Sequence, residues 1–241
     1  MRKLIVASLF AGLSLTGCGK IDNAGESSDV KAQVTYNQAM DAYKVISAIN
    51  YLPFLFIEDG CYARSLYMSM ELASQGIPSS AHYIYGDLRP TAEVNWGYHV
   101  APMIQIGNSE PWILDPAMDK QPLPVTKWVA KNFPNGRFTE ETKAGSAYFD
   151  YYRRTTQFNN NRMIQNFAEM PAFLTSDVAS ACTVMYNYIP EQGNFIEAAA
   201  MRSRLLKKTA DLLNNLYGRG KLIVNGVPVD TNSACRKAAG F

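Results

Sequence analysis

Residues 59–64 read DGCYAR, at the point where a stretch of turn-forming residues gives way to a helical pattern. Apolar positions at helical spacing predict a helix over 61–74 that begins at Cys61. The N-terminus of a helix carries a partial positive charge, which stabilises a thiolate and so favours Cys61 as a nucleophile. A buried structural cysteine is the commoner role for this residue type, but Gly60 and the helix start favour the catalytic role.

A histidine and an aspartate lie at the ends of the strand-like segments that follow. Segments 98–106 and 112–115 are joined by turn-forming residues and are predicted to form a β-hairpin. The hairpin would bring His99 beside Asp115, whose carboxylate can then orient the imidazole. His82 is the other histidine of the chain, and its strand has no acidic hairpin partner. The order Cys, His, Asp therefore predicts a hydrolase with a thiol nucleophile.

Other roles for these residues stay open at this point. Asp115 precedes Pro116 and could instead cap the following turn. A histidine alone on a strand is commonly a structural residue held by hydrogen bonds. The sequence contains no histidine pair at helical spacing and no closely spaced cysteine pair, which disfavours a metal site. No cofactor is expected.

The N-terminus resembles a bacterial lipoprotein signal. Residues 1–17 begin with a short positive segment, and their apolar run of about a dozen residues is too short to span a bilayer. The Leu-Thr-Gly before Cys18 is similar to a lipobox, so Cys18 is expected to carry a diacylglycerol anchor with acyl chains such as palmitate. An ordinary secretory signal peptide is the alternative. Gly19 favours outer-membrane sorting, so the protein is expected in the cell envelope, lipid-anchored, or exported.

The rest of the chain divides into a tether and two larger parts. Residues 18–33 are polar and are predicted to form a flexible tether after the lipidated cysteine. Residues 34–136 begin with a helical pattern over 34–50, contain the motifs above, and are predicted to form the catalytic core. Residues 137–241 are predicted to be mainly helical, with a broad apolar stripe along 192–217 that packs on this core.

Cysteine usage predicts one disulfide. Of the four cysteines, Cys182 and Cys235 remain once Cys18 and Cys61 have been assigned. Two remaining thiols in an oxidising compartment predict a Cys182–Cys235 bond. It would close a loop of roughly fifty residues and stabilise the fold by about 4 kcal/mol. A bond between Cys61 and one of them is the alternative, and it would leave an odd thiol.

Composition and charge exclude some classes of partner. The formal net charge is +2, and Arg2 and Lys3 leave with the signal segment, so the mature chain is close to neutral. Acidic and basic residues are interspersed, and no basic face indicates a nucleic-acid partner. An aromatic content of 12% suits a well-packed domain or a peptide-binding surface. A membrane contact is expected only through the N-terminal lipid.

Four motifs resemble those of the bacterial protein-glutaminases, secreted enzymes that deamidate glutamine side chains in proteins. They occur in matching order and approximate spacing: DGCYAR at 59–64, YGDL at 85–88, WGYHVA at 96–101 and ILDP at 113–116. The resemblance covers about residues 57–128. It implies an α+β fold similar to transglutaminases and papain-like peptidases, in which the catalytic cysteine begins a helix packed on an antiparallel sheet carrying histidine and aspartate.

Matched residue by residue, the catalytic triad of that family falls on Cys61, His99 and Asp115. The reaction that the resemblance implies is acyl transfer to Cys61 with release of ammonia, followed by hydrolysis of the thioester. The expected partner is a protein or peptide with an accessible glutamine.

Aromatic residues near the motifs are candidate substrate-binding residues. Tyr62, Trp96 and Tyr98 would wall a narrow channel for the carboxamide arm, with ordinary aromatic packing as the alternative. Arg64, one turn into the helix, is a candidate for either a substrate contact or a salt bridge.

Two further readings of the function remain beside deamidation. A related cysteine peptidase, amidase or transglutaminase would share the acyl-enzyme and differ in the amide that enters and the nucleophile that accepts the acyl group. A non-catalytic envelope lipoprotein could keep the same fold as a binding module.

Overall fold

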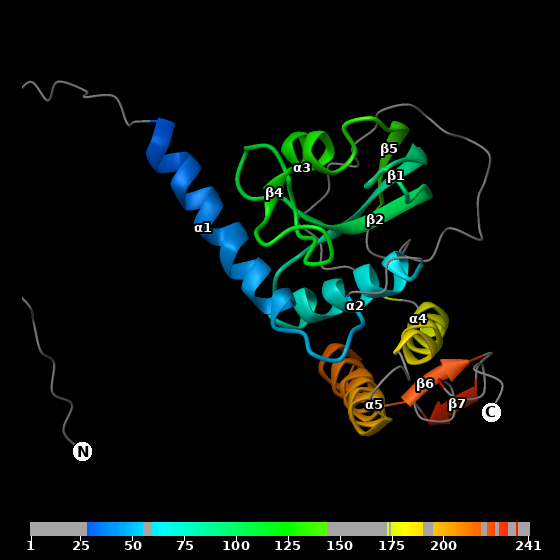
Figure 1. The fold of residues 1–241 in the computed structure, drawn as a ribbon. Helices are drawn as coiled ribbons and strands as arrows, with labels where there is room; N and C mark the ends of the chain where they lie inside the picture. The colour runs from blue at the N-terminus through cyan, green and yellow to red at the C-terminus, as the bar shows by residue number, and fades with distance from the viewer. Residues whose placement is uncertain are drawn as a thin grey trace, which may run out of the picture.

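The chain folds into layers of helices around one antiparallel sheet (Figure 1). The computed structural model describes the following residues of the 241-residue chain: 28–54, 59–143, 173, 175–189, 195–217, 221–224, 227–230 and 235. Helix α3 (Val125–Asn132) lies on one face of the sheet and helix α2 (Cys61–Ser74) on the other, with α4 (Thr175–Tyr188) and α5 (Phe195–Tyr217) beyond α2. This mixed architecture confirms the predicted α+β class. The predicted signal segment 1–17 and Cys18 lie outside the described residues.

The main sheet has five strands in the order β4-β3-β2-β1-β5, and each neighbouring pair is antiparallel. The strands are β1 (Ser80–Leu88), β2 (Trp96–Ile104), β3 (Trp112–Ile113), β4 (Leu123–Pro124) and β5 (Arg137–Lys143). The predicted hairpin is confirmed, because β2 pairs with β3 from Met103 opposite Ile113. The Leu114 N–H donates to the Pro102 carbonyl at 2.9 Å, which carries the pairing to the edge of Asp115.

Alternating side chains of β1 and β2 form two separate apolar cores. Tyr83 and Val100 face α2 (Cys61–Ser74) and join the larger core. Ile84 and Ala101 face the opposite side, where α3 (Val125–Asn132) covers them. Because successive strand residues point to opposite faces, this single register assigns each residue of the motifs to one core or the other.

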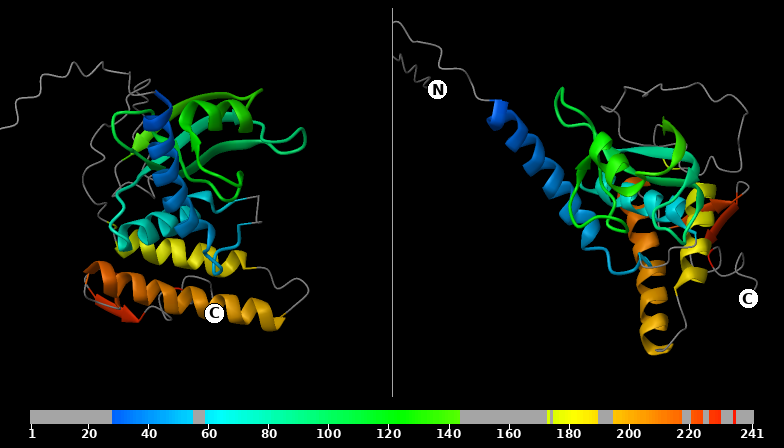
Figure 2. Two further views of the ribbon diagram at one scale, coloured as in Figure 1. Left: turned by 90° about the vertical axis from the view of Figure 1, so that its left-hand side faces the viewer. Right: turned by 45° about the horizontal axis from the view of Figure 1, so that its top comes forward.

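Helix α2 is buried along almost its whole length, from Cys61 to Ala73. The sheet covers one side of it, and α1 (Ser28–Ser47), α4 and α5 cover the others (Figure 2). Its two charged residues have partners, as burial requires. The Glu71 carboxylate accepts a hydrogen bond from the Tyr51 hydroxyl at 2.7 Å and lies 3.0 Å from the Lys208 ammonium.

The bounds of α2 agree with those predicted. At its end the Gly76 N–H donates to the Ala73 carbonyl and the Ile77 N–H to the Leu72 carbonyl, and Gly76 has a φ of 75°. This is a Schellman cap, in which glycine adopts the left-handed conformation that other residues rarely do. The predicted glycine stop is thereby confirmed.

The C-terminal part consists of α4 (Thr175–Tyr188), α5 (Phe195–Tyr217) and the hairpin of β6 (Lys221–Val224) and β7 (Val227–Asp230). Its buried side chains belong to the same core as α2 and the sheet. The Tyr67 hydroxyl of α2, for example, lies 2.6 Å from the Thr209 hydroxyl of α5. The predicted disulfide is present between Cys182 and Cys235, with their Cα atoms 5.3 Å apart, and Cys61 is a free, buried thiol.

Two boundaries differ from the prediction. Helix α1 begins at Ser28, inside the segment predicted as tether, because no glycine or proline interrupts the chain before Ser47. Strand β5 adds to the sheet beyond residue 136, where the helical part was expected to begin. The side-chain pattern of β5 is mostly polar, as suits an edge strand, and it lacks the apolar alternation by which strands are recognised.

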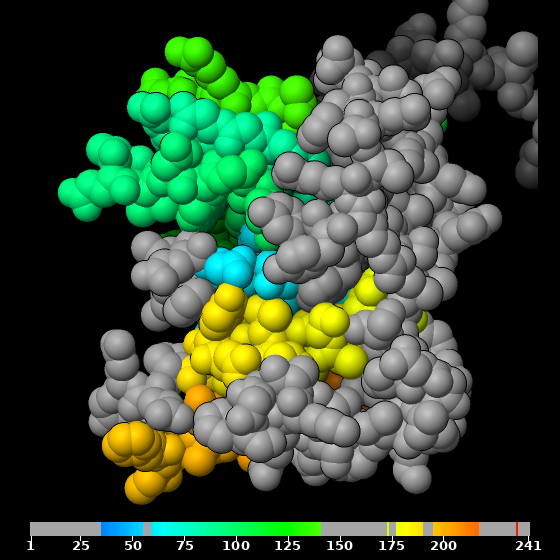
Figure 3. Space-filling model, turned by 90° about the vertical axis from the view of Figure 1, so that its right-hand side faces the viewer, coloured from blue at the N-terminus to red at the C-terminus, as the bar shows by residue number. Residues whose placement is uncertain are grey.

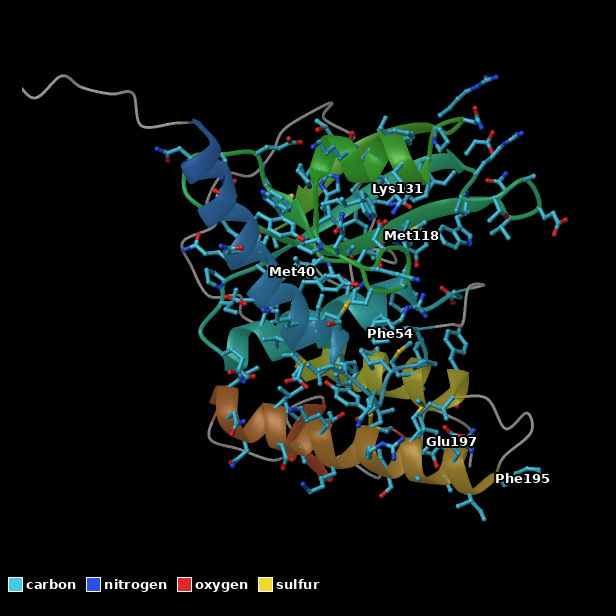
Figure 4. All side chains as sticks on the ribbon, turned by 60° about the vertical axis from the view of Figure 1, so that its left-hand side comes forward. Met40, Phe54, Met118, Lys131, Phe195 and Glu197 are labelled. Atoms are coloured by element: carbon cyan, nitrogen blue, oxygen red, sulfur yellow. A yellow bond between two sulfur atoms is a disulfide. The ribbon has the colours of Figure 1, made fainter. Side chains whose placement is uncertain are left out.

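The free end of α5 carries the largest exposed apolar side chains among the described residues. Phe195 and Ile196 are 74% and 83% exposed, and Phe195 projects from the end of the helix (Figure 4). Across the described helices, none combines the length and the apolar character that a membrane span requires.

Candidate active site

Cys61 is the first residue of α2, as predicted. Gly60 before it has a φ of 87°, a left-handed conformation, and its carbonyl accepts the first helical hydrogen bond from the Arg64 N–H at 2.9 Å. Cys61 is 8% exposed, and its side chain lies at the positive end of the helix. A side chain at position 60 would also have no room, since its Cβ would lie 2.9 Å from Tyr188 Cδ2 and from Met185 Cε.

The imidazole of His99 is held between a carboxylate and aromatic rings. Its Nε2–H donates to Asp115 Oδ2 at 2.8 Å, and both side chains are almost fully buried. Trp96 and Trp128 stack on the ring, with centroids 5.1 and 5.7 Å away. Because Nε2 is occupied by Asp115, Nδ1 is the nitrogen that remains for Cys61, with which His99 shares a hydrogen bond.

The electrostatic surroundings favour the charged form of His99. Burial alone lowers its pKa, but the charge and hydrogen bond of Asp115, together with the hydrogen bond and charge of Cys61, outweigh burial and raise the pKa to about 9. The site therefore favours a charged imidazole hydrogen-bonded beside the Cys61 side chain, and such a proton donor and acceptor is what a thiol nucleophile requires.

The loop that carries Asp115 is fixed at both of its ends. Asp115 Oδ1 accepts the Ala117 N–H, and the Asp115 carbonyl accepts the N–H groups of Met118 and Asp119. The buried Asp119 carboxylate in turn binds Lys131 and Asn132 at the end of α3. Figure 4 labels Lys131 on α3 and also Met118, which packs against the core on the α3 side of the sheet.

Helix α1 also reaches this loop. The Tyr43 hydroxyl donates to the Asp119 carbonyl, and burial, followed by the charges of Asp115 and Asp119, raises the pKa of Tyr43 to about 12. Tyr43 therefore stays protonated and remains a donor. The position of the carboxylate that orients His99 thus depends on α1 and α3 as well as on the hairpin.

A cavity of about 150 Å³ opens beside the thiol. It is lined by Asp59, Cys61 and Arg64 around the start of α2 and by residues 95–99 at the start of β2. Trp96 and Tyr98 line it, as predicted for two of the three aromatic residues. Tyr62 is not among the lining residues, and its ring stacks on that of Tyr98 with centroids 6.4 Å apart.

Tyr98 and Arg64 both approach the sulfur. Burial raises the pKa of Tyr98 well above its usual value, and the charge of Cys61 and a hydrogen bond to it raise it further, so the Tyr98 hydroxyl is a donor toward Cys61. Burial lowers the pKa of Arg64, against the opposing charge of Cys61. Its Nη1 donates to the carbonyls of Asp59 and Pro53, at 3.1 and 3.4 Å.

His82, the second histidine, is part of a different contact. It lies on the same sheet face as His99 but bonds Glu140 of β5, at 2.9 Å between Nε2 and Oε2. Among the described residues, no cluster of three or more His, Cys, Asp or Glu side chains has the arrangement of a metal site.

The part of the chain that holds the site matches a known family model. The sequence model of the family described as glutaminase matches residues 33–132. The match covers less than half of the 241-residue chain. This part of the chain contains Cys61, His99 and Asp115, and it ends at the last residue of α3. The family predicted from the four motifs is thereby confirmed.

Solved structures of protein-glutaminase are among those that resemble this chain. A crystal structure of protein-glutaminase is 21% identical, with a TM-score of 0.46, over 65% of this chain and 87% of that one. The solution structure of protein-glutaminase from Chryseobacterium proteolyticum is 20% identical, with a TM-score of 0.45, over 61% of this chain and 84% of that one.

The precursor form is matched over a shorter stretch. A crystal structure of pro-protein-glutaminase is 24% identical, with a TM-score of 0.40, over 46% of this chain. The match spans about half of that chain, 48% of its length. No curated protein matches the present sequence.

Sequence reasoning did not find several residues of the site. Asp59 and Asn95 line the cavity. Asp59 is the first residue of the DGCYAR motif, and Asn95 directly precedes the WGYHVA motif. Trp128 stacks on His99 from α3, and Tyr188 reaches Asp59 from α4, where its hydroxyl donates to Oδ2 at 2.7 Å. Adjacency to Gly60-Cys61 was a usable signal for Asp59, whereas no local pattern marks Trp128 or Tyr188.

Proposed function

We propose that this protein is a cysteine hydrolase that converts glutamine side chains of proteins or peptides into glutamate and ammonia. The observation that carries the proposal is the meeting of Cys61, His99 and Asp115 at the start of α2. These residues lie within the part of the chain that matches the glutaminase family model.

In the first half of the reaction, the Cys61 thiolate attacks the carboxamide carbon and a C–S bond forms. The Cys61 backbone N–H, at the start of the helix, is a donor for the oxyanion that develops. His99, as imidazolium, gives its Nδ1 proton to the leaving nitrogen, the C–N bond breaks, and ammonia departs. The acyl group remains on Sγ as a thioester.

In the second half, water attacks the thioester after ammonia has left. Neutral His99 takes a proton from water while the oxygen adds to the thioester carbon, and the C–S bond then breaks to release glutamate. The thiolate and the imidazolium are thereby restored. Throughout, Asp115 accepts the Nε2–H, which holds the ring in place and stabilises its charged form.

The dimensions of the cavity support a side chain as the substrate. A volume of about 150 Å³ between Trp96, Tyr98 and the thiol suits the end of an unbranched carboxamide arm. A segment of main chain with its own side chains needs a wider cleft, since ligand pockets for larger groups commonly exceed about 300 Å³. This favours deamidation over cleavage of the peptide backbone.

We also propose that the protein works at the cell envelope. The support is the lipobox-like sequence before Cys18, which would attach a diacylglycerol group there. Substrates would then be proteins that reach the membrane surface. Mass analysis of the N-terminal peptide from wild type and from Cys18→Ser tests this, and an unmodified Cys18 peptide in the envelope fraction would contradict it.

Ammonia release tests the proposed reaction most directly. Protein lacking residues 1–18 is incubated with a glutamine-containing peptide and with an unfolded protein, and both products are analysed by mass spectrometry. We expect ammonia, conversion of Gln to Glu and no chain cleavage. The variants Cys61→Ala and His99→Gln should abolish the reaction. His82→Gln is the control, because His82 is a buried histidine on the same sheet face as His99.

The outcome also separates the neighbouring reactions. Peptide cleavage would indicate a peptidase, and transfer of an added amine in preference to water would indicate a transglutaminase. If Cys61 alkylates no faster than an unperturbed thiol and no ammonia appears, the protein is not an enzyme of this class and a binding role replaces the proposal.

A further inference from the structure

Helix α4 packs directly on the turn that presents Cys61. Figure 3 shows a small cyan patch of α2 enclosed between the green sheet and the yellow α4. The contact is close: a Cβ at Gly60 would lie 2.9 Å from side-chain atoms of both Met185 and Tyr188. Helix α4 lies outside the residues that match the glutaminase family, so this contact comes from the C-terminal part of the chain.

A hydrogen bond joins the same helix to the residue before Gly60. The Tyr188 hydroxyl donates to Asp59 Oδ2 at 2.7 Å, across 129 residues of sequence. From the opposite side, Arg64 Nη1 donates to the Asp59 carbonyl at 3.1 Å. Asp59 is thus held by α2 through its main chain and by α4 through its side chain.

The end of α4 is itself held in place. The Arg202 side chain of α5 donates to the carbonyls of Tyr186 and Ile189, at 3.2 and 3.3 Å, and its guanidinium lies 5.0 Å from the centre of the Tyr186 ring. The Cys182–Cys235 disulfide fixes the helix at a point earlier in its length. Tyr188 therefore projects from a restrained helix end.

The turn needs this support because its central residue is glycine. Gly60 adopts a left-handed conformation, and glycine has the widest choice of backbone conformations of any residue. A rotation at Gly60 would move Cys61 Sγ and the Cys61 N–H together. Displacements of about 1 Å in a catalytic group are enough to cost about a hundredfold in rate.

We propose that Tyr188 is a positioning residue, which acts through Asp59 to hold the turn at Gly60 so that the Cys61 thiol faces His99. The effect on turnover rests on the proposed deamidase function, but the effect on the thiol does not. The C-terminal part is then a component of the active site, and its removal from the core would disable the nucleophile without altering any triad residue.

A double-mutant cycle in the full chain tests this. The variants are Tyr188→Phe, Asp59→Ala and both together, with Tyr186→Phe as the control, since Tyr186 is a tyrosine of the same helix that contacts Arg202 instead of Asp59. The readouts are the rate of Cys61 alkylation by iodoacetamide, and kcat and KM for a glutamine peptide. Near-ultraviolet circular dichroism checks that each variant is folded.

We expect Tyr188→Phe to lower the alkylation rate several-fold and kcat by about tenfold, with KM unchanged. Tyr186→Phe should match wild type. The double variant should be no worse than Asp59→Ala alone, because both changes remove the same hydrogen bond. Effects that multiply in the double variant, or a Tyr188→Phe alkylation rate equal to wild type, would overturn the proposal.

The two readouts keep this inference separate from the proposed function. If wild type releases no ammonia but the alkylation cycle is non-additive, the positioning role stands and deamidation fails. If wild type deamidates and the alkylation cycle shows no coupling, deamidation stands and the positioning role fails.

Discussion

His99 Nε2 lies 2.8 Å from Asp115 Oδ2, in a place where less than a twentieth of either side chain is exposed. A hydrogen bond between a buried imidazole and a buried carboxylate sets which ring nitrogen carries the proton. Here it directs Nδ1, the other nitrogen, to Cys61. The relationship makes the charge of Asp115, and not merely its shape, necessary for the site.

Asp115→Asn should therefore lower kcat by about two to four orders of magnitude. The amide keeps the size of the side chain, but its NH2 group can face Nε2 and favour the wrong tautomer. Ammonia release at substrate saturation measures the loss. A variant that retains more than a tenth of wild-type kcat would show that Asp115 does not orient His99.

The stability of the protein should depend on pH through His99. Its pKa rises from 6.5 to about 9 on folding, so its stabilising contribution is complete below about pH 6.5 and is lost as the pH rises through 9. The full shift corresponds to about 3 kcal/mol in the free energy of unfolding. Urea unfolding of wild type and of His99→Gln at pH 6, 7.5 and 9 measures it, and an equal pH dependence in both would refute the assignment.

Asp119→Ala should destabilise the fold by about 1–3 kcal/mol, because it leaves the buried Asn132 amide without its acceptor. It should also reduce activity, since the Asp115 loop loses its attachment to α3. Lys131→Met is the matched control: the Lys131 side chain is 59% exposed, and loss of its charge should cost less than about 1 kcal/mol. Thermal unfolding and ammonia release measure both effects. Equal losses in the two variants would argue against a role for the buried amide.

Gly86→Ala should cost about 2–4 kcal/mol, because a Cβ there would lie 2.0 Å from the Arg137 carbonyl of β5 at a φ of 145°. Gly76→Ala separates the two causes, since its φ of 75° is also unfavourable but its Cβ would meet no atom within 4 Å. We expect about 1 kcal/mol for that variant. Chemical denaturation compares them, and a Gly76 variant as unstable as the Gly86 variant would mean that the steric clash is unimportant.

Local signals explain why parts of this structure were predictable. The bounds of α2 follow from the Gly60 turn before it and the glycine stop at its end, both of which are encoded within a few residues. The hairpin that joins His99 to Asp115 follows from two apolar segments with turn residues between them. In both cases neighbouring residues determine the conformation.

The remaining features depend on contacts between distant segments. β5 has a polar sequence and becomes a strand because the edge of β1 offers it hydrogen-bond partners. Trp128 lies on His99 because α3 crosses that face of the sheet. Tyr188 meets Asp59 only once α4 has packed on α2. No periodicity within these segments records such contacts.

The enclosure of α2 has a consequence for the order in which the molecule is completed during synthesis. The segments that surround this helix lie on both sides of it in the sequence: α1 precedes it, and α4, α5 and the cysteine partner Cys235 follow it. A ribosome that has translated only as far as α3 has already produced Cys61, His99 and Asp115, yet one side of the central helix still has no cover. The segments translated after α3 therefore complete the cover of the core and the surroundings of the thiol together.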